Sequence, residues 1–244
     1  MKKIIALLLS LILILGILSG CVTKKVKVVD EDDKKTSSRK DTDDEKEKEE
    51  EEEEETTPTK KEEEEQVTPP VQTGYVRGTS NTTGWKSEFL GLQFKASATM
   101  TMSTEEEMLA MMQLGQEYVN GSAQIDYTTL DNVYEMMAVD LNNSNVIVMA
   151  QKLPLANMTE QTIALGMKQN LESQTGLNYV VTDPFEFTFC GKDCVALDAS
   201  ASINGLTVSQ SYIIMKVEDR VCAIAITSNT EGFLEQALAC FSPC

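Results

Sequence analysis

A long charged stretch with very few apolar side chains divides this chain of 244 residues and limits what can fold. Residues 30–70 include an unbroken glutamate run from Glu49 to Glu55 and end in Pro69-Pro70. Such a segment buries too little apolar surface to offset the entropy lost on ordering, and its like charges extend the chain. We therefore expect a disordered acidic tether. It is either a solvated spacer or a tail that binds cations weakly and without specificity.

The charge balance of the whole chain restricts the partners it can have. The sequence carries 21 Lys+Arg against 39 Asp+Glu, a formal net charge of −18, and contains no histidine. An acidic chain without a basic block is a poor candidate for binding nucleic acid, because contacts to phosphate supply most of that affinity. The lack of histidine removes the commonest general base and metal ligand. We therefore expect no nucleic-acid partner.

Residues 1–20 have the parts of a secretory signal peptide. Lys2 and Lys3 form a basic start, and residues 4–18 are apolar except for Ser10 and Gly16. This run is shorter than the roughly twenty apolar residues that a membrane-spanning helix needs. The pattern indicates an export signal, while an uncleaved helix that ends in a cysteine is the alternative.

The end of this segment, Leu18-Ser19-Gly20-Cys21, resembles the bacterial lipobox, in which a leucine and two small residues precede a cysteine. The resemblance implies that the Cys21 thiol carries a diacylglycerol and that the chain is cut before Cys21. Acyl chains such as palmitate supply about 0.8 kcal/mol of membrane affinity for each buried methylene. We therefore expect a lipoprotein held on the extracytoplasmic face of the cell membrane.

The remaining sequence alternates strand and helix patterns. We expect a signal peptide at 1–20, a lipid-anchored disordered acidic linker at 21–84 and one folded domain at 85–244. The expected elements are a strand at 90–96, a helix after the capping box Ser103–Glu106, a hairpin of 133–140 with 146–152, a helix from Glu160 capped by Thr159, strands at 185–189, 195–199, 206–217 and 221–227, and a helix from about Glu231. Short turns such as Asn204-Gly205 connect the last strands and favour antiparallel pairing. The fold class is therefore α+β: an α/β sandwich with a central, mainly antiparallel sheet flanked by helices.

This domain resembles the small PsbP-like (Mog/PsbP-fold) lipoproteins of Gram-positive bacteria. The matching features are Trp85, the strand Phe89 to Phe94, hairpin turns at Gly191-Lys192 and Asn204-Gly205, the strand Tyr212-Ile213-Ile214 and a C-terminal helix. Ala98-Thr99-Met100 departs from the family, which usually has a turn like Pro-x-Gly-Trp there. The resemblance implies an α/β sandwich without shared catalytic residues, and members that act as accessory or partner-binding modules.

Besides Cys21 the chain has five cysteines: Cys190, Cys194, Cys222, Cys240 and Cys244. An exported location permits disulfides. Cys190 and Cys194 flank a three-residue loop, so we expect them to lie opposite each other, on the face away from the phenylalanines of 185–189, and we favour a bridge between them. Other pairings stay open, as do free thiols and a zinc site made from the two Cys-x₃-Cys pairs. We expect no metal and no cofactor.

No motif for a nucleophile elbow, a phosphate loop or a metalloprotease helix is present in the sequence. Asp140, Asn142 and Ser144 mimic the start of a calcium loop but lack its glycine and closing glutamate, so we reject that site. Strand carboxylates could form an acid/base pair, but we expect them to face solvent: Glu135, Asp140, Glu186 and Asp198. The methionines form either an adaptable apolar surface or, as we favour, core filler: Met108, Met111, Met112, Met136 and Met137.

Three functions remain. We expect a non-catalytic binding or accessory module, held to the membrane by the diacylglycerol at Cys21 and facing a protein partner at the cell surface. The alternative is a solute-binding component of a transport system, although such receptors usually close two lobes around a ligand. A histidine-free hydrolase with a carboxylate pair is the third candidate.

Overall fold

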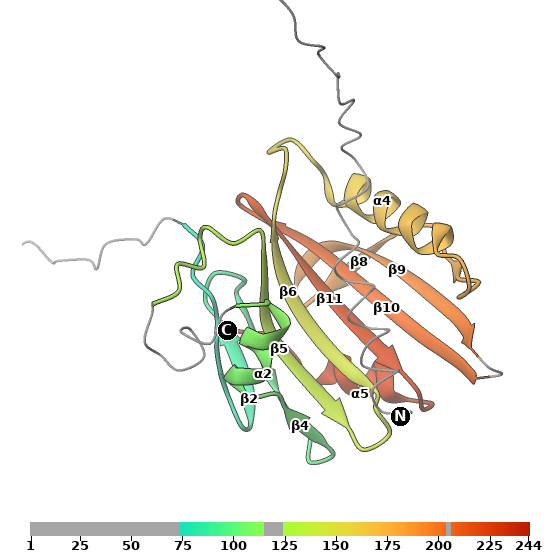
Figure 1. Cartoon of the computed structure of the whole chain (residues 1–244), viewed down its shortest axis with the longest axis horizontal. Coiled ribbons are helices and arrows are strands. Elements are labelled where there is room, and N and C mark those ends of the chain that lie inside the picture. Colours follow the sequence, from blue (N-terminus) through green and yellow to red (C-terminus); the bar gives the residue numbers. More distant parts are fainter. Residues whose placement is uncertain (1–73, 115–123, 204–205) are drawn as a thin grey trace, which may run out of the picture. The chain divides into compact units, whose positions relative to one another are not determined.

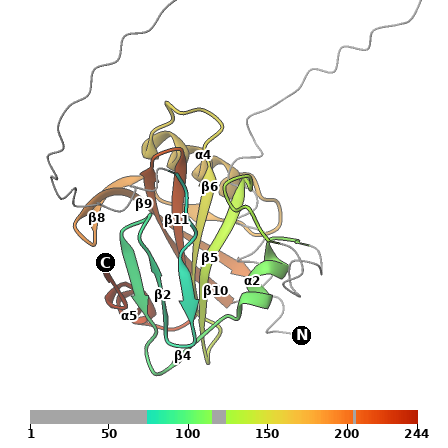
Figure 2. The same ribbon diagram turned by 90° about the vertical axis from the view of Figure 1, so that its left-hand side faces the viewer.

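The computed structural model describes residues 74–114, 124–203 and 206–244. The predicted signal peptide, Cys21 and most of the acidic tether lie outside the described residues. Within those ranges the chain forms two antiparallel sheets and three helices, so it is mainly β (Figures 1 and 2). None of the helices in these ranges has the length and hydrophobicity needed to cross a membrane.

The larger sheet has eight strands, all paired antiparallel. Seven of them follow the order β4-β5-β6-β11-β10-β9-β7, and β8 also pairs with β9. Their bounds are β4 Met100–Met102, β5 Asn132–Asp140, β6 Asn145–Lys152, β7 Val180–Val181, β8 Phe185–Phe189, β9 Lys192–Ile203, β10 Leu206–Val217 and β11 Arg220–Ser228. The β5–β6, β9–β10 and β10–β11 hairpins that the turn residues predicted are all confirmed.

The smaller sheet joins the two ends of the domain in the order β1-β2-β3-β12. Its strands are β1 Thr79–Asn81, β2 Gly84–Ser87, β3 Leu92–Lys95 and β12 Phe241–Pro243. Sequence analysis placed residues up to 84 in the linker, and this was wrong for residues 75–84. Tyr75 is 5% exposed and β1 pairs with β2, so the folded domain begins near Tyr75.

A helix covers one face of the large sheet. Helix α4 (Glu160–Ser173) begins where it was predicted, because the Thr159 hydroxyl accepts from the backbone N–H of Thr162 at 3.2 Å. Its buried residues lie on one side of the helix, three or four residues apart except for the adjacent first pair, and pack on the sheet: Ile163, Ala164, Met167 and Leu171. This layer matches the expected helix-on-sheet packing (Figure 1).

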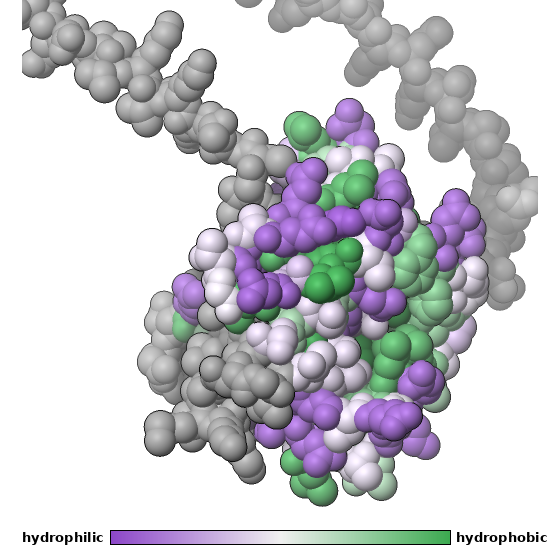
Figure 3. Space-filling model, turned by 90° about the vertical axis from the view of Figure 1, so that its right-hand side faces the viewer, coloured by the Kyte–Doolittle hydropathy of each residue, from purple (hydrophilic) through white to green (hydrophobic). Residues whose placement is uncertain are grey.

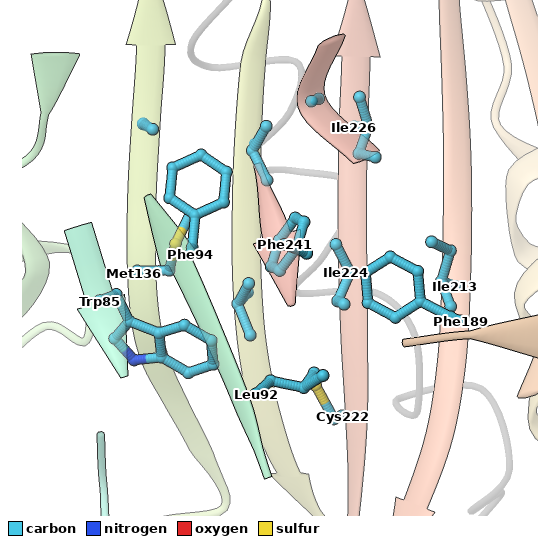
Figure 4. Close-up of a cluster of buried hydrophobic side chains, with 14 of the residues drawn as sticks. Trp85, Leu92, Phe94, Met136, Phe189, Ile213, Cys222, Ile224, Ile226 and Phe241 are labelled. Carbon is cyan, nitrogen blue, oxygen red and sulfur yellow. The ribbon is translucent and has the colours of Figure 1, made fainter. Parts of the chain in front are cut away.

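The small sheet and α5 (Phe233–Ala239) cover the opposite face of the large sheet. The packing of one sheet on the other was not predicted from the sequence. Figure 4 shows Trp85, Leu92, Phe94 and Phe241 of the small sheet facing residues of the large sheet such as Met136 and Ile224. Phe241 contacts the rings of Phe94 and Phe189 at centroid distances of 4.8 and 5.2 Å. The prediction of a mainly antiparallel sheet is therefore confirmed. The prediction that only helices flank it is wrong, because a second sheet packs on one of its faces.

The two short helices begin one or two residues later than predicted. Helix α2 (Glu105–Met111) has Thr104 as its N-cap and Glu107 as the reciprocal residue of the capping box, not Ser103 and Glu106. Helix α5 starts at Phe233 after Gly232, which has a φ of 78°. The helix ends at Ala239, and Phe241 already belongs to β12.

Candidate functional site

The ladder between β9 and β10 ends early, and this opens a hollow in the large sheet. The last pair is Val195 with Ile214, although β9 begins at Lys192 and β10 continues to Val217. The β8–β9 hairpin therefore separates from the rest of the sheet, and it curves away in Figure 2. The hollow has a volume of about 630 Å³ and is lined by Glu160, Glu186, Phe187, Thr188, Asp193, Cys194 and Val195.

A side chain from α4 replaces part of the missing ladder. The backbone N–H of Lys216 on β10 donates to Glu160 Oε1 at 3.1 Å. The Lys216 ammonium points to the loop before α4, where Nζ donates to the carbonyls of Ala156 at 2.6 Å and Met158 at 3.1 Å. Helix α4 and the loop before it therefore bond to the unpaired end of β10, and Glu160 also lines the hollow.

The hollow is acidic. Three of its lining residues are carboxylates, Glu160, Glu186 and Asp193, and no lysine or arginine is among those named. No group of three His, Cys, Asp or Glu residues able to hold a metal ion exists in the described part of the chain. The three carboxylates therefore make the hollow complementary in charge to a cationic group.

The cysteines do not lie as predicted. The β8–β9 hairpin turns through two residues, Cys190 (φ 50°) and Gly191 (φ 77°), because Phe189 pairs with Lys192. Cys194 consequently lies opposite Phe187 and not Cys190, and shares its face with the phenylalanines. A two-residue turn with both φ values positive fits the twist of the strands better than the expected three-residue loop.

The five cysteines of the described domain are free thiols; two of them are buried in the core, and two more are half-buried against it. Cys194 and Cys222 lie on β9 and β11 with β10 between them, about 10 Å apart at a strand spacing of about 4.8 Å, which is beyond disulfide reach. Burial raises the pKa of Cys194 to about 11 and that of Cys222 well above its usual value. Burial also raises the pKa of Cys190 and Cys240. These thiols are poor nucleophiles because the thiolate is disfavoured.

A second polar cluster is sealed inside the domain around Glu135. Sequence analysis expected Glu135 to face solvent, but its side chain is fully buried (0% exposed). Tyr75 Oη donates to Oε1 at 2.6 Å, while the Gly78 N–H and Trp85 Nε1 donate to Oε2 at 2.7 and 3.2 Å. Burial raises the pKa of Glu135, although the hydrogen bonds from Tyr75 and Gly78 act in the opposite direction.

A β-bulge explains why the strand pattern misled the prediction. Tyr134 pairs with Met149 and Met136 with Val148, which leaves Glu135 without a partner on β6. Tyr134 therefore packs on the α4 side, whereas Met136 packs between the sheets. A regular strand would put both on one face, so only the bulge frees Glu135 to accept from the N-terminal segment.

Two arginines complete this cluster. Arg220 is 1% exposed, stacks on the Tyr75 ring at 3.9 Å, and donates to the carbonyls of Leu130, Tyr127 and Thr128, each at 3.1 Å. Arg77 donates from Nε to the Tyr134 carbonyl at 2.9 Å and pairs with Glu105. The cluster ties residues 75–85 to the sheet. It is closed to solvent, so its role is structural.

The other strand carboxylates, for which an acid/base pair was considered and rejected, are not brought together. Asp140 accepts from the backbone N–H groups of Asn142 and Ser144 at 2.8 Å, which makes it a turn residue. Glu186 pairs with Val195, and Asp198 accepts from the Ser211 hydroxyl at 2.6 Å. Nothing in the sequence predicted that Glu186, Glu160 and Asp193 line one hollow, because Glu160 comes from a helix distant in the chain.

The methionines divide between core and surface. Met108, Met136 and Met137 are buried core residues, as favoured. Met111 and Met112 are half-buried and line a smaller hollow of about 240 Å³ with Gln113, Leu130, Asp131, Asn132 and Tyr134.

Comparisons with known proteins assign no family. The sequence matches no protein-family model and no curated protein. Three solved structures show weak similarity. LpqN, involved in cell envelope biogenesis of Mycobacterium tuberculosis, is 15% identical with a TM-score of 0.32 over 46% of this chain and 78% of LpqN. A Pseudomonas aeruginosa protein of unknown function is 10% identical with a TM-score of 0.28, over 38% of this chain and 63% of its own.

The third structure, from Bacteroides thetaiotaomicron, is 10% identical with a TM-score of 0.34, over 65% of this chain and 47% of its own. This chain thus spans less than two thirds of the Pseudomonas and Bacteroides proteins. At these scores none of the three carries an argument about fold or function. The resemblance to PsbP-like lipoproteins stays a prediction.

Proposed function

We propose that this protein is a membrane-anchored extracytoplasmic lipoprotein whose domain is a non-catalytic binding or accessory module. The observation that carries the proposal is Leu18-Ser19-Gly20-Cys21, which follows a basic start and a short apolar run. A diacylglycerol on Cys21 would hold the chain on the membrane, and the acidic segment would space the domain from it. The PsbP-like resemblance supports a role in binding a partner protein.

The chemistry of the domain supports a binding role. Its buried carboxylate, Glu135, has its oxygens occupied by Tyr75, Gly78 and Trp85. Cys190, Cys194, Cys222 and Cys240 are buried or half-buried thiols, and burial raises their pKa values. The accessible chemistry is therefore the acidic hollow, which offers charge complementarity to a ligand but no paired nucleophile and base.

Substitution of Cys21 by serine tests the anchor. Cys21→Ser is expected to abolish labelling of the protein by radioactive palmitate in cells and to leave an uncleaved precursor or release the chain into the medium. Cys244→Ser is the matched control, because it removes an exposed cysteine and should leave labelling and fractionation unchanged. Palmitate labelling that persists in Cys21→Ser would overturn the anchor.

Crosslinking in living cells tests the binding role. An extracytoplasmic partner that is recovered with the wild-type chain and lost with Cys21→Ser supports a membrane-anchored module. The alternative, a solute receptor, gains support from the volume of the hollow, about 630 Å³, which is in the range of small-molecule sites. A rise in melting temperature with a small cationic solute, and no crosslinked protein, would favour that alternative.

A further inference from the structure

One edge of the large sheet is open. Among the residues that the structure describes, β7 and β8 each pair with β9 alone, so their outer edges have no strand beside them. Val180 on β7 is 73% exposed and Phe185 on β8 is 41% exposed. Viewed from the side on which β9 and β10 lie, the surface mixes hydrophobic patches with hydrophilic side chains (Figure 3). An exposed apolar edge of this kind is a template for a further strand.

The two faces of β8 differ in chemistry. Side chains alternate along a strand, so Phe185 and Phe187 lie on one face and Glu186 and Thr188 on the other. Phe187 packs against the core between the sheets. Glu186 is paired with Val195, which packs on the α4 side, so Glu186 faces the acidic hollow.

The hollow extends the negative charge from β8 toward β9 and α4. Glu160 from α4 and Asp193 from β9 line it together with Glu186. A strand added along the outer edge of β8 would therefore have its side chains on one face beside Glu186, with Asp193 one strand further in, and those on the other face beside phenylalanine rings. This edge is therefore suited to a strand in which basic and apolar residues alternate.

We propose that the outer edge of β8 binds an extended segment of another protein in which basic and apolar residues alternate, added as a strand to the large sheet. The inference rests on the proposed function as a binding module and names the chemistry of its partner. Main-chain hydrogen bonds give affinity, and the pairing of a basic side chain with Glu186 gives selectivity. A second copy of this chain fits the edge poorly, because the Glu186 carboxylates of the two copies would lie near each other across the new ladder.

The test uses the whole chain from residue 21 with Cys21→Ser, to avoid the lipid, and a fluorescent ten-residue peptide of alternating lysine and valine. Fluorescence anisotropy measures the Kd. Two control peptides separate the contributions: one carries glutamate in place of lysine, and one is N-methylated at alternate residues so that it keeps its charges but loses main-chain hydrogen bonds. Both controls are expected to bind at least tenfold more weakly.

Glu186→Lys should weaken binding of the lysine peptide at least tenfold, and added salt should weaken binding by the wild-type edge. The matched variant is Glu231→Lys, which makes the same charge change at an exposed site near the opposite end of the strands and should bind as the wild type does. Equal binding of the N-methylated peptide, or no effect of Glu186→Lys, would overturn the proposal. A concentration-dependent dimer in the absence of peptide would assign the edge to a second copy instead.

The outcome is separate from that of the proposed function. If the peptide does not bind but crosslinking still identifies a partner, the module stands and the edge is not its binding site. If the peptide binds while palmitate labelling survives Cys21→Ser, the edge stands and the anchor does not.

Discussion

At β5 one carboxylate is enclosed by three donors, whereas at the β8–β9 hairpin three carboxylates line an open hollow. The first arrangement uses both oxygens of Glu135 and excludes water. The second leaves Glu186 and Asp193 exposed to solvent, with only Glu160 bonded to the backbone of Lys216. Charge that is buried and satisfied fixes structure, while charge that stays accessible can select a ligand.

The same contrast appears in the backbone. At β5 a bulge is filled by the N-terminal segment, which donates from Gly78 and Trp85. At β9 the ladder with β10 ends, and nothing in the described chain fills the gap except the side chain of Glu160. Both regions interrupt a regular sheet, but only the second one stays open. This difference predicts that mutations at the two sites affect different properties.

The largest expected effect is loss of stability in Glu135→Ala. The change leaves the Tyr75 hydroxyl, the Gly78 N–H and the Trp85 indole N–H buried without an acceptor, and we expect a loss of about 3 kcal/mol in the free energy of unfolding. Urea denaturation followed by tryptophan fluorescence measures it. Glu186→Ala, which removes an exposed carboxylate, should stay within about 0.5 kcal/mol of wild type. Equal losses in the free energy of unfolding would show that Glu135 is no more important for stability than the exposed Glu186.

A smaller effect is expected from Gly78→Ala, which tests how tightly the N-terminal segment is held. A Cβ at this position would lie 2.4 Å from Trp85 Nε1 and 2.8 Å from Glu135 Oε2, so the donor and the acceptor must both shift and we expect a loss of about 2 kcal/mol in the free energy of unfolding. Gly166→Ala is the matched control, because no atom lies within 4 Å of its added Cβ and it sits inside α4. That variant should be stabilised by up to about 1 kcal/mol. A melting temperature that is higher for Gly78→Ala than for Gly166→Ala would contradict the close approach of Gly78 to Trp85 and Glu135.

The smallest effect at neutral pH is expected from Glu135→Gln, which keeps the shape of the side chain. The pKa of Glu135 is raised in the folded state by burial. As the pH rises above the ordinary value of 4.5, the unfolded chain releases this proton before the folded chain does, so the folded state binds more protons. The wild type should therefore lose stability relative to Glu135→Gln between pH 4.5 and the folded pKa.

Unfolding by urea at a series of pH values gives this difference directly. Taking the wild type minus the variant cancels the titration of the other carboxylates, which are common to both. A difference that stays constant with pH would show that Glu135 has the same pKa in the folded and unfolded chains, and one that moves in favour of the wild type as pH rises would show that its folded pKa is lowered. Either result would contradict the prediction.

Local patterns predicted much of the fold. Thr159 and the spacing of Ile163, Met167 and Leu171 defined α4, because capping and helical periodicity depend on neighbours in the sequence. The turns at Asn142–Ser144 and Asp219 joined paired strands for the same reason. The small sheet was missed, since β12 pairs with β3 through residues that are far apart in the sequence.

The candidate site was predicted only in fragments. Glu186 was noted as a strand carboxylate, but Glu160 was read only as a helix start and Asp193 as a turn residue. Cys190 and Cys194 were placed opposite each other because the turn was taken as three residues long, and a shift of one residue moves a side chain to the other face. Strand register, which sequence periodicity does not define, was therefore the missing information.

The sequence alone determined the signal for a lipid anchor, the acidic tether as a prediction, and the helices and hairpins whose contacts are local. The tertiary structure decided that Glu135 is buried, that the domain begins near Tyr75, and that three carboxylates from α4, β8 and β9 share one hollow. The reason is physical: capping, periodicity and turns are set by residues a few positions apart. Bulges, ladder ends and the burial of a charge depend instead on strands that meet only when the sheets pack.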